Sequence, residues 1–102
     1  METTKRMKTI YLLLISLFLM SGNIAAQDWA NLKQFQKDNA ALGAPAKGEK
    51  RVVFMGNSIT IGWLHNCPEF FKDRPYINRG ISGQTTPQML IRFRQDVIDL
   101  QP

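Results

Sequence analysis

Two short apolar runs, each followed by a polar turn and a helix signal, constrain the fold of this chain most strongly. The first run, Arg-Val-Val-Phe-Met, is rich in β-branched and aromatic residues, which is typical of a strand buried in a parallel sheet. The predicted elements are strands at 51–55 and 76–78, and helices at 28–42, 59–64, 68–72 and from Thr86 onward. This alternation predicts an α/β layered fold with a parallel sheet.

The two outer helices of this scheme carry the clearest local signals. Asp28 can cap the first, and a breaker-rich linker follows it at 43–48. The last is expected to begin with Thr86 as cap and Pro87 in the first helical position. Its apolar stripe comprises Met89, Phe93, Val97 and Leu100, and its opposite face carries Arg92, Gln95 and Asp99.

The 102 residues allow at most one domain. Two strands and three main helices cannot cover both faces of a parallel sheet, and the sequence reaches Gln101-Pro102 where a third strand is expected. A domain this small usually needs disulfides or a structural metal. The single cysteine, Cys67, excludes an internal disulfide and a cysteine-based metal cage. We therefore expect a partial domain.

The first 26 residues have the layout of a secretory signal peptide. A basic start containing Lys5, Arg6 and Lys8 precedes a run of about a dozen apolar residues, which is shorter than the roughly 20 of a spanning helix. Small residues follow, and cleavage is predicted after Ala26. The expected organisation is a signal peptide at 1–26, an N-terminal helix and linker at 27–50, and an α/β domain portion at 51–102. We expect a secreted or periplasmic protein with no stable membrane anchor after cleavage.

The charge pattern argues against a nucleic-acid partner. The formal net charge is +5, but the basic residues are scattered and form no stripe with aromatic side chains. His65, the only histidine, is expected at the surface, and Cys67 is expected to be a small packed residue.

A serine in the first strand-to-helix turn is the strongest candidate for chemistry. Gly56-Asn57-Ser58 follows the strand, at the sheet edge where α/β proteins bind ligands. A hydroxyl at a helix N-terminus, beside free backbone N–H groups, suits a nucleophile whose reaction creates an oxyanion. The alternatives are that Ser58 merely caps the helix, or that the Gly56 turn binds phosphate. The second loop, residues 79–86, leaves the same edge and contains Gly83, whose N–H has no side chain in its way.

Together these loops resemble the SGNH, or GDSL-like, hydrolase family. Gly56-Asn57-Ser58-Ile-Thr resembles block I, usually Gly-Asp-Ser, and residues 80–85, Gly-Ile-Ser-Gly-Gln-Thr, resemble block II. The resemblance covers 51–102 and implies a flavodoxin-like α/β/α sandwich that hydrolyses esters without a metal or other cofactor. It implies that Ser58 is the nucleophile and first oxyanion donor and that Gly83 is the second donor.

The sequence departs from the family pattern in two ways. Asn57 replaces the usual aspartate and is expected to be a tolerated variant. The family's oxyanion asparagine, in Gly-x-Asn-Asp, and its catalytic Asp-x-x-His block do not occur in these 102 residues. The resemblance therefore implies an esterase portion that is inactive alone, with acetyl or other short acyl esters of glycans or lipids as the expected substrates.

The alternative is a secreted non-catalytic module that binds a sugar or small ligand, with Trp29, Trp63 and Phe70-Phe71 available for stacking. The oligomeric state is left open.

Overall fold

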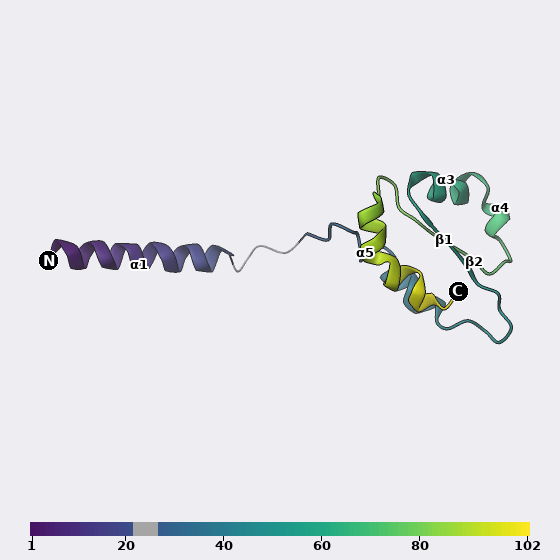
Figure 1. Ribbon diagram of the computed structural model, residues 1–102, viewed down its shortest axis with the longest axis horizontal. Coiled ribbons are helices and arrows are strands. Elements are labelled where there is room, and N and C mark those ends of the chain that lie inside the picture. Colours follow the sequence, from purple (N-terminus) through teal and green to yellow (C-terminus); the bar gives the residue numbers. More distant parts are fainter. Residues whose placement is uncertain (22–26) are drawn as a thin grey trace.

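A computed structural model describes residues 1–21 and 27–102 of the chain (Figure 1). The N-terminal helix α1 covers Glu2–Ser21 and includes the basic and apolar parts of the predicted signal peptide. The predicted cleavage point after Ala26 lies outside the described residues. None of the helices in the described ranges combines the length and the apolar character needed to span a bilayer.

Helices and strands alternate along the rest of the chain, as the sequence predicts. The elements are α2 (Gln36–Leu42), β1 (Val52–Gly56), α3 (Ser58–Asn66), α4 (Pro68–Phe71), β2 (Tyr76–Gly80), α5 (Thr86–Asp96) and a 3₁₀ turn (Ile98–Leu100). The two strands pair in parallel, with Val52 opposite Tyr76 and Gly56 opposite Gly80. In Figure 1, α3 and α4 lie on one side of this two-stranded sheet and α5 lies on the other. The predicted α/β fold class with a parallel sheet is confirmed.

An aromatic cluster attaches α3 and α4 to the sheet. Phe54 of β1 contacts Trp63 of α3 edge-to-face, with ring centroids 5.2 Å apart. The same ring meets Phe71 of α4 at 5.6 Å and Tyr76 of β2 at 5.5 Å, and Trp63 stacks on Phe70 at 4.4 Å. Such aromatic pairs stabilise a core beyond their buried area. The cluster therefore fixes the helix that starts at Ser58 against both strands.

The predicted helix over residues 28–42 is wrong in its first half. Only Gln36–Leu42 is helical, and turns occupy the residues before it. Asn31 has a left-handed φ of 57°, which an α-helix does not tolerate. The Asp28 carboxylate accepts hydrogen bonds from the backbone N–H groups of Leu32 (2.8 Å) and Lys33 (2.9 Å), and these bonds lower the pKa of Asp28. Asp28 therefore caps a turn rather than a continuous helix.

The N-cap of α5 lies one residue earlier than predicted. Thr85, not Thr86, is the N-cap, and it forms a capping box with Gln88, whose side chain accepts from the Thr85 N–H at 2.8 Å. Pro87 remains within the first turn, where its missing N–H costs no helical hydrogen bond.

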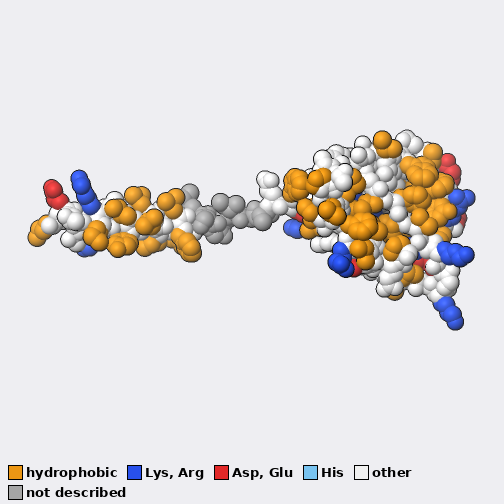
Figure 2. Space-filling model, in the orientation of Figure 1, with side chains coloured by type: hydrophobic (Ala, Val, Ile, Leu, Met, Phe, Trp, Pro, Cys, Tyr) orange, Lys and Arg blue, Asp and Glu red, His pale blue; other side chains and the backbone are white. Residues whose placement is uncertain are grey.

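The buried side of α5 is polar, which the apolar stripe did not predict. Arg92 and Asp96 are both 0% exposed, whereas Phe93 is 40% exposed and Leu90 is 73% exposed. Leu100, just beyond the helix, is the stripe residue that is buried. Figure 2 shows hydrophobic side chains gathered on the visible face of the molecule around α5. The difference arises because Arg92 and Asp96 find hydrogen-bond partners on other segments, described below.

A close backbone approach fixes α3 over the end of β2. A Cβ atom at Gly80 would lie 2.5 Å from the backbone nitrogen of Ile61 and 3.0 Å from the carbonyl oxygen of Asn57. Both are backbone atoms of the first turn of α3, so neither can rotate away. The glycine is therefore required by packing rather than by its φ angle.

Replacing Gly80 tests this packing. We expect Gly80→Ala to lower the free energy of unfolding by about 1–3 kcal/mol, because the added methyl group overpacks the contact with α3. Gly62→Ala is the matched control, since its Cβ would meet no atom closer than 3.9 Å and alanine is the better helix former, by about 1 kcal/mol. Chemical denaturation of the full chain, followed by circular dichroism, measures both; equal stability of the two variants would contradict the packing.

Candidate active site

The two loops predicted to carry the chemistry start side by side at one edge of the sheet. Gly56 ends β1 and Gly80 ends β2, and these two residues are opposite each other in the parallel ladder. The Ile81 N–H donates to the Gly56 carbonyl oxygen at 3.1 Å, which continues the pairing by one step. Ser58 therefore follows its strand by two residues and Gly83 follows its strand by three, from the same carboxyl edge.

Ser58 is the first residue of α3, and its side chain is exposed. Asn57 is the N-cap, and its Oδ1 accepts from the Ile59 N–H at 3.4 Å. The interpretation of Ser58 as the helix cap is therefore wrong. Within the described residues, no group forms a hydrogen bond with the Ser58 hydroxyl. The hydroxyl stands at the positive end of the helix dipole, where a developing negative charge is stabilised.

Gly83 lies at the tip of the second loop in a conformation suited to glycine. Its φ is +77°, it is exposed, and the space around its missing side chain is empty. The Gln84 N–H donates to the Ile81 carbonyl oxygen at 3.3 Å, so residues 81–84 form a β-turn with Gly83 in the third position. Positive φ at this position is the signature of a type II turn. No described residue accepts a hydrogen bond from the Gly83 N–H, which is available for a bound oxygen atom.

The buried guanidinium of Arg92 forms hydrogen bonds with both loops. Arg92 of α5 donates from Nη2 to the Gly56 carbonyl oxygen (3.2 Å) and from Nε to Oε1 of Gln84 (2.5 Å). Its Nη1 forms a salt bridge with Asp96 Oδ2 at 3.2 Å, with both side chains fully buried. Gly56 precedes Ser58 by two residues and Gln84 directly follows Gly83. One planar guanidinium group therefore contacts both segments of the candidate site.

The residues between Asp28 and Leu42, called the N-terminal segment below, also contribute to this network. Asn39 of α2 donates to Asp96 Oδ1 at 2.8 Å and accepts from Arg79 Nε at 2.9 Å. The Gln84 side chain also donates to the backbone carbonyl oxygen of Ala30 at 2.7 Å. Among the described residues, every buried side-chain nitrogen and oxygen atom has a hydrogen-bond partner. Burial lowers the pKa of the Arg79 guanidinium.

Sequence reasoning missed this network. It placed Arg92 on a polar face opposite the apolar stripe and assigned no function to the segment before β1. The available signal was the spacing of Arg92 and Asp96, which are four residues apart and so lie on one helix face. That spacing is equally typical of an exposed ion pair, so it does not predict burial.

Asn78 holds α3 in place from β2. Its Nδ2 donates to the Thr60 carbonyl oxygen at 2.8 Å, and its Oδ1 accepts from the Gly80 N–H at 2.9 Å. The side chain thus satisfies a carbonyl in the first turn of α3 and an amide at the strand end. Together with the Gly80 approach, it sets the position of the helix that begins with Ser58.

The other titratable candidates lie apart from these loops. His65 is exposed near the end of α3, about 10 Å along the helix axis from Ser58 at 1.5 Å per residue. The prediction that Cys67 is packed is wrong, because this residue is exposed at the junction of α3 and α4. Among the residues that the structure describes, no group of three or more His, Cys, Asp or Glu side chains could hold a metal ion.

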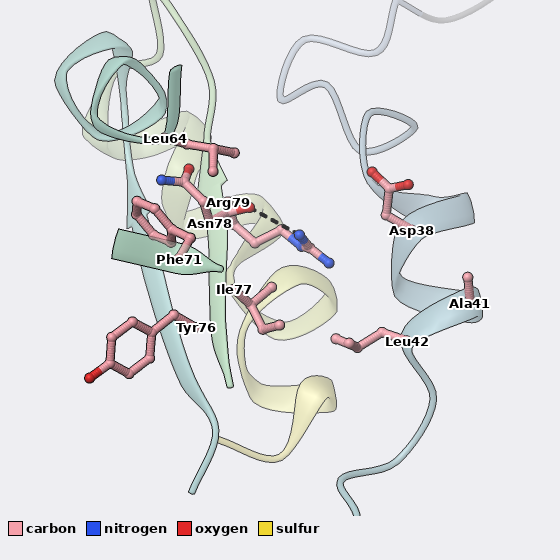
Figure 3. Close-up of a pocket in the computed structure, with 9 residues that line it drawn as sticks. All are labelled: Asp38, Ala41, Leu42, Leu64, Phe71, Tyr76, Ile77, Asn78 and Arg79. Carbon is pink, nitrogen blue, oxygen red and sulfur yellow. Dashed lines mark hydrogen bonds between the residues drawn. The ribbon is translucent and has the colours of Figure 1, made fainter. Parts of the chain in front are cut away.

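A pocket of about 390 Å³ lies between α2 and β2, away from both loops (Figure 3). Most of its walls are apolar, and Asp38 of α2 and Arg79 of β2 face each other across it. Neither Ser58 nor Gly83 lines it. The pocket is therefore separate from the candidate active site.

No protein-family profile and no curated protein matches this chain. Solved structures do match, and two of them are described here. One is a proposed acylhydrolase from Bacteroides fragilis, with 60% sequence identity and a TM-score of 0.72 over 76% of this chain and 37% of that chain. The other is a GDSL-like lipase from Bacteroides thetaiotaomicron, with 62% identity and a TM-score of 0.69 over 72% of this chain and 36% of that chain. Over about three quarters of its length, this chain is therefore similar to hydrolases of the SGNH, or GDSL-like, kind.

This similarity agrees with the sequence resemblance carried by the two loops. The chain spans just over a third of the length of these two relatives. The roles of Ser58 and Gly83, and the supporting roles of Gly56 and Asn57, remain predictions that the geometry described above accommodates.

Removing the carboxylate from the buried pair tests the network. We expect Asp96→Ala to lower the free energy of unfolding by about 3–5 kcal/mol, because Arg92 is then left charged and buried without its partner. Asp99→Ala is the matched control at the same end of the chain, since Asp99 is exposed and its loss should change stability by less than about 0.5 kcal/mol. Urea denaturation of the full chain measures both. A loss of unfolding free energy below about 1 kcal/mol for Asp96→Ala would show that Arg92 and Asp96 do not form a buried ion pair in solution.

Proposed function

We propose that this chain supplies the nucleophile and two backbone oxyanion donors of a secreted or periplasmic serine ester hydrolase. The observation that carries the proposal is the exposed Ser58 hydroxyl at the start of α3, on the same sheet edge as the Gly83 N–H. Neither group has a hydrogen-bond partner among residues 1–21 and 27–102. The identity of 60–62% to an acylhydrolase-type protein and a GDSL-like lipase supports ester hydrolysis as the reaction class.

In the proposed reaction, Ser58 Oγ attacks the ester carbonyl carbon while a histidine accepts the hydroxyl proton. The carbonyl oxygen becomes an oxyanion that accepts from the N–H groups of Ser58 and Gly83. The alcohol leaves with the proton returned by the histidine, and water then hydrolyses the acyl-serine by the same steps. Each oxyanion donor is worth about 3 kcal/mol of barrier.

The histidine and the third oxyanion donor must come from chain outside these 102 residues. His65 is the only histidine in the sequence, and it is separated from Ser58 by nearly the whole of α3. A serine without a base is barely nucleophilic at neutral pH. We therefore propose that the 102-residue chain has no useful esterase activity alone. The hydrophobic side chains exposed around α5 support a larger fold, because a covering layer would bury them.

Short acyl esters, including acetyl esters of glycans or lipids, are the proposed substrates, and the predicted signal peptide is the basis for the proposed export. The rival interpretation as a sugar-binding module has weaker support. Trp63, Phe70 and Phe71 pack against one another and against Phe54, so they do not form an open stacking platform.

The test uses two proteins: the full chain, and a chimera in which residues 27–102 replace the matching segment of the 62% identical GDSL-like lipase. With p-nitrophenyl acetate, we expect the full chain to show no turnover above buffer and the chimera to be active. Ser58→Ala should lower kcat of the chimera by at least about 10³-fold, because the acyl-enzyme cannot form.

The control is Thr86→Ala, which removes an exposed hydroxyl from the first residue of α5 and should leave the chimera's kcat within about twofold. Turnover by the full chain that Ser58→Ala abolishes would contradict the need for an outside base. A chimera whose activity survives Ser58→Ala would contradict the nucleophile.

A further inference from the structure

Gln84 has an unusual environment for a residue in a solvent-exposed loop. Its neighbours Gly83 and Thr85 are exposed, yet Gln84 itself is 7% exposed. Both ends of its amide are used: Oε1 accepts from Arg92 Nε at 2.5 Å, and Nε2 donates to the Ala30 carbonyl oxygen at 2.7 Å. A side chain held at both ends fixes the backbone from which it projects.

The backbone that Gln84 fixes is the turn that presents Gly83. On one side of the turn, Ile81 is tied to β1 through the Gly56 carbonyl oxygen, and on the other side Gln84 is tied to α5 and to Ala30. The Gln84 N–H closes the turn onto the Ile81 carbonyl oxygen. Gly83 itself makes no packing contact through a side chain, so its orientation depends on these two anchors.

The same guanidinium that holds Gln84 also holds the end of β1. Arg92 reaches the Gly56 carbonyl oxygen at 3.2 Å, and Gly56 leads directly to Asn57 and Ser58. Because the guanidinium is planar and its donors are fixed relative to one another, it sets the separation between the turn of Gly83 and the strand of Ser58. Asp96 compensates its charge and is itself held by Asn39 of the N-terminal segment.

From these contacts we infer that Gln84 is a positioning residue. Its hydrogen bonds to Arg92 and to the Ala30 carbonyl oxygen orient the turn so that the Gly83 N–H points toward the oxyanion. Only the identity of the bound oxygen as an oxyanion rests on the proposed function. The orientation of the Gly83 N–H is a property of the chain that can be measured without catalysis.

Three substitutions separate this role from a general effect on stability. Gln84→Met keeps the length of the side chain but removes both hydrogen bonds. Gln84→Glu keeps the acceptor for Arg92 and replaces the donor to Ala30 with a second acceptor oxygen. Gln95→Met is the comparison variant. The Gln95 side chain also joins α5 to a backbone carbonyl oxygen before β1, at Leu32, and it reaches Asp96 Oδ1 at 3.4 Å, but it contacts neither Arg92 nor the turn.

The first readout is the residual dipolar coupling of the Gly83 N–H in the labelled full chain, with the Gly48 N–H as an internal reference. We expect Gln84→Met to change the Gly83 coupling, Gln84→Glu to restore most of it, and Gln95→Met to leave it unchanged. A Gly83 coupling unchanged in Gln84→Met, or changed equally in Gln95→Met, would overturn the inference.

The second readout is the kinetics of the chimera. A displaced donor should lower kcat by at least about tenfold while KM stays within about twofold, since the oxyanion exists only after substrate has bound. Gln84→Glu should recover most of this kcat. Equal effects on kcat and KM would indicate a structural role and overturn the inference. If Ser58→Ala leaves the chimera active while the Gly83 coupling still responds to Gln84, the proposed function fails and the positioning of the turn stands.

Discussion

The hydrogen bonds and the salt bridge of the fully buried Arg92 guanidinium are the interactions on which the rest of this structure depends. The guanidinium meets a carbonyl at the end of β1, a side chain in the second loop and a carboxylate on its own helix, so three segments share one rigid group. Burying such a charge is expensive unless it is paired and hydrogen-bonded. The observed partners meet that condition, and the result is a defined arrangement of segments rather than a large gain in stability.

The catalytic proposal follows from how that arrangement meets the sheet. Parallel pairing places Gly56 and Gly80 opposite each other, so both loops begin at one edge. Aromatic packing, the close approach at Gly80 and the two hydrogen bonds of Asn78 then fix α3, whose first residue is Ser58. In the proposed reaction, the hydroxyl at the helix N-terminus is the nucleophile and the glycine N–H of the turn is an oxyanion donor. The base and the third donor are the groups that these residues do not supply.

Local patterns in the sequence were sufficient for the strands, their parallel pairing and the exposed turn at Ser58. Each of these depends on contiguous residues: the β-branched run before Gly56, the shorter run before Asn78, and the glycines that end them. The same holds for the start of α5 to within one residue, because Thr85 and Thr86 are both suitable caps and only the reach of Gln88 decides between them.

Long-range contacts explain what the sequence did not predict. Helical spacing before β1 suggested one helix, but Asp28 captures two backbone N–H groups and Asn31 turns left-handed, so only the last seven residues are helical. The apolar stripe of α5 suggested its buried side, yet Arg92 and Asp96 are buried because Gln84 and Asn39 reach them from elsewhere in the chain. No local pattern contains that information.

The most direct measurement of the central claim is solvent exchange of the arginine Nε–H protons in the full chain, followed by nitrogen-edited NMR. The account predicts that the Arg92 Nε–H exchanges slowly and shows a nuclear Overhauser contact with the Gln84 side chain, while the exposed Arg94 on the same helix exchanges rapidly. Equally rapid exchange for Arg92 and Arg94, without the contact to Gln84, would contradict it.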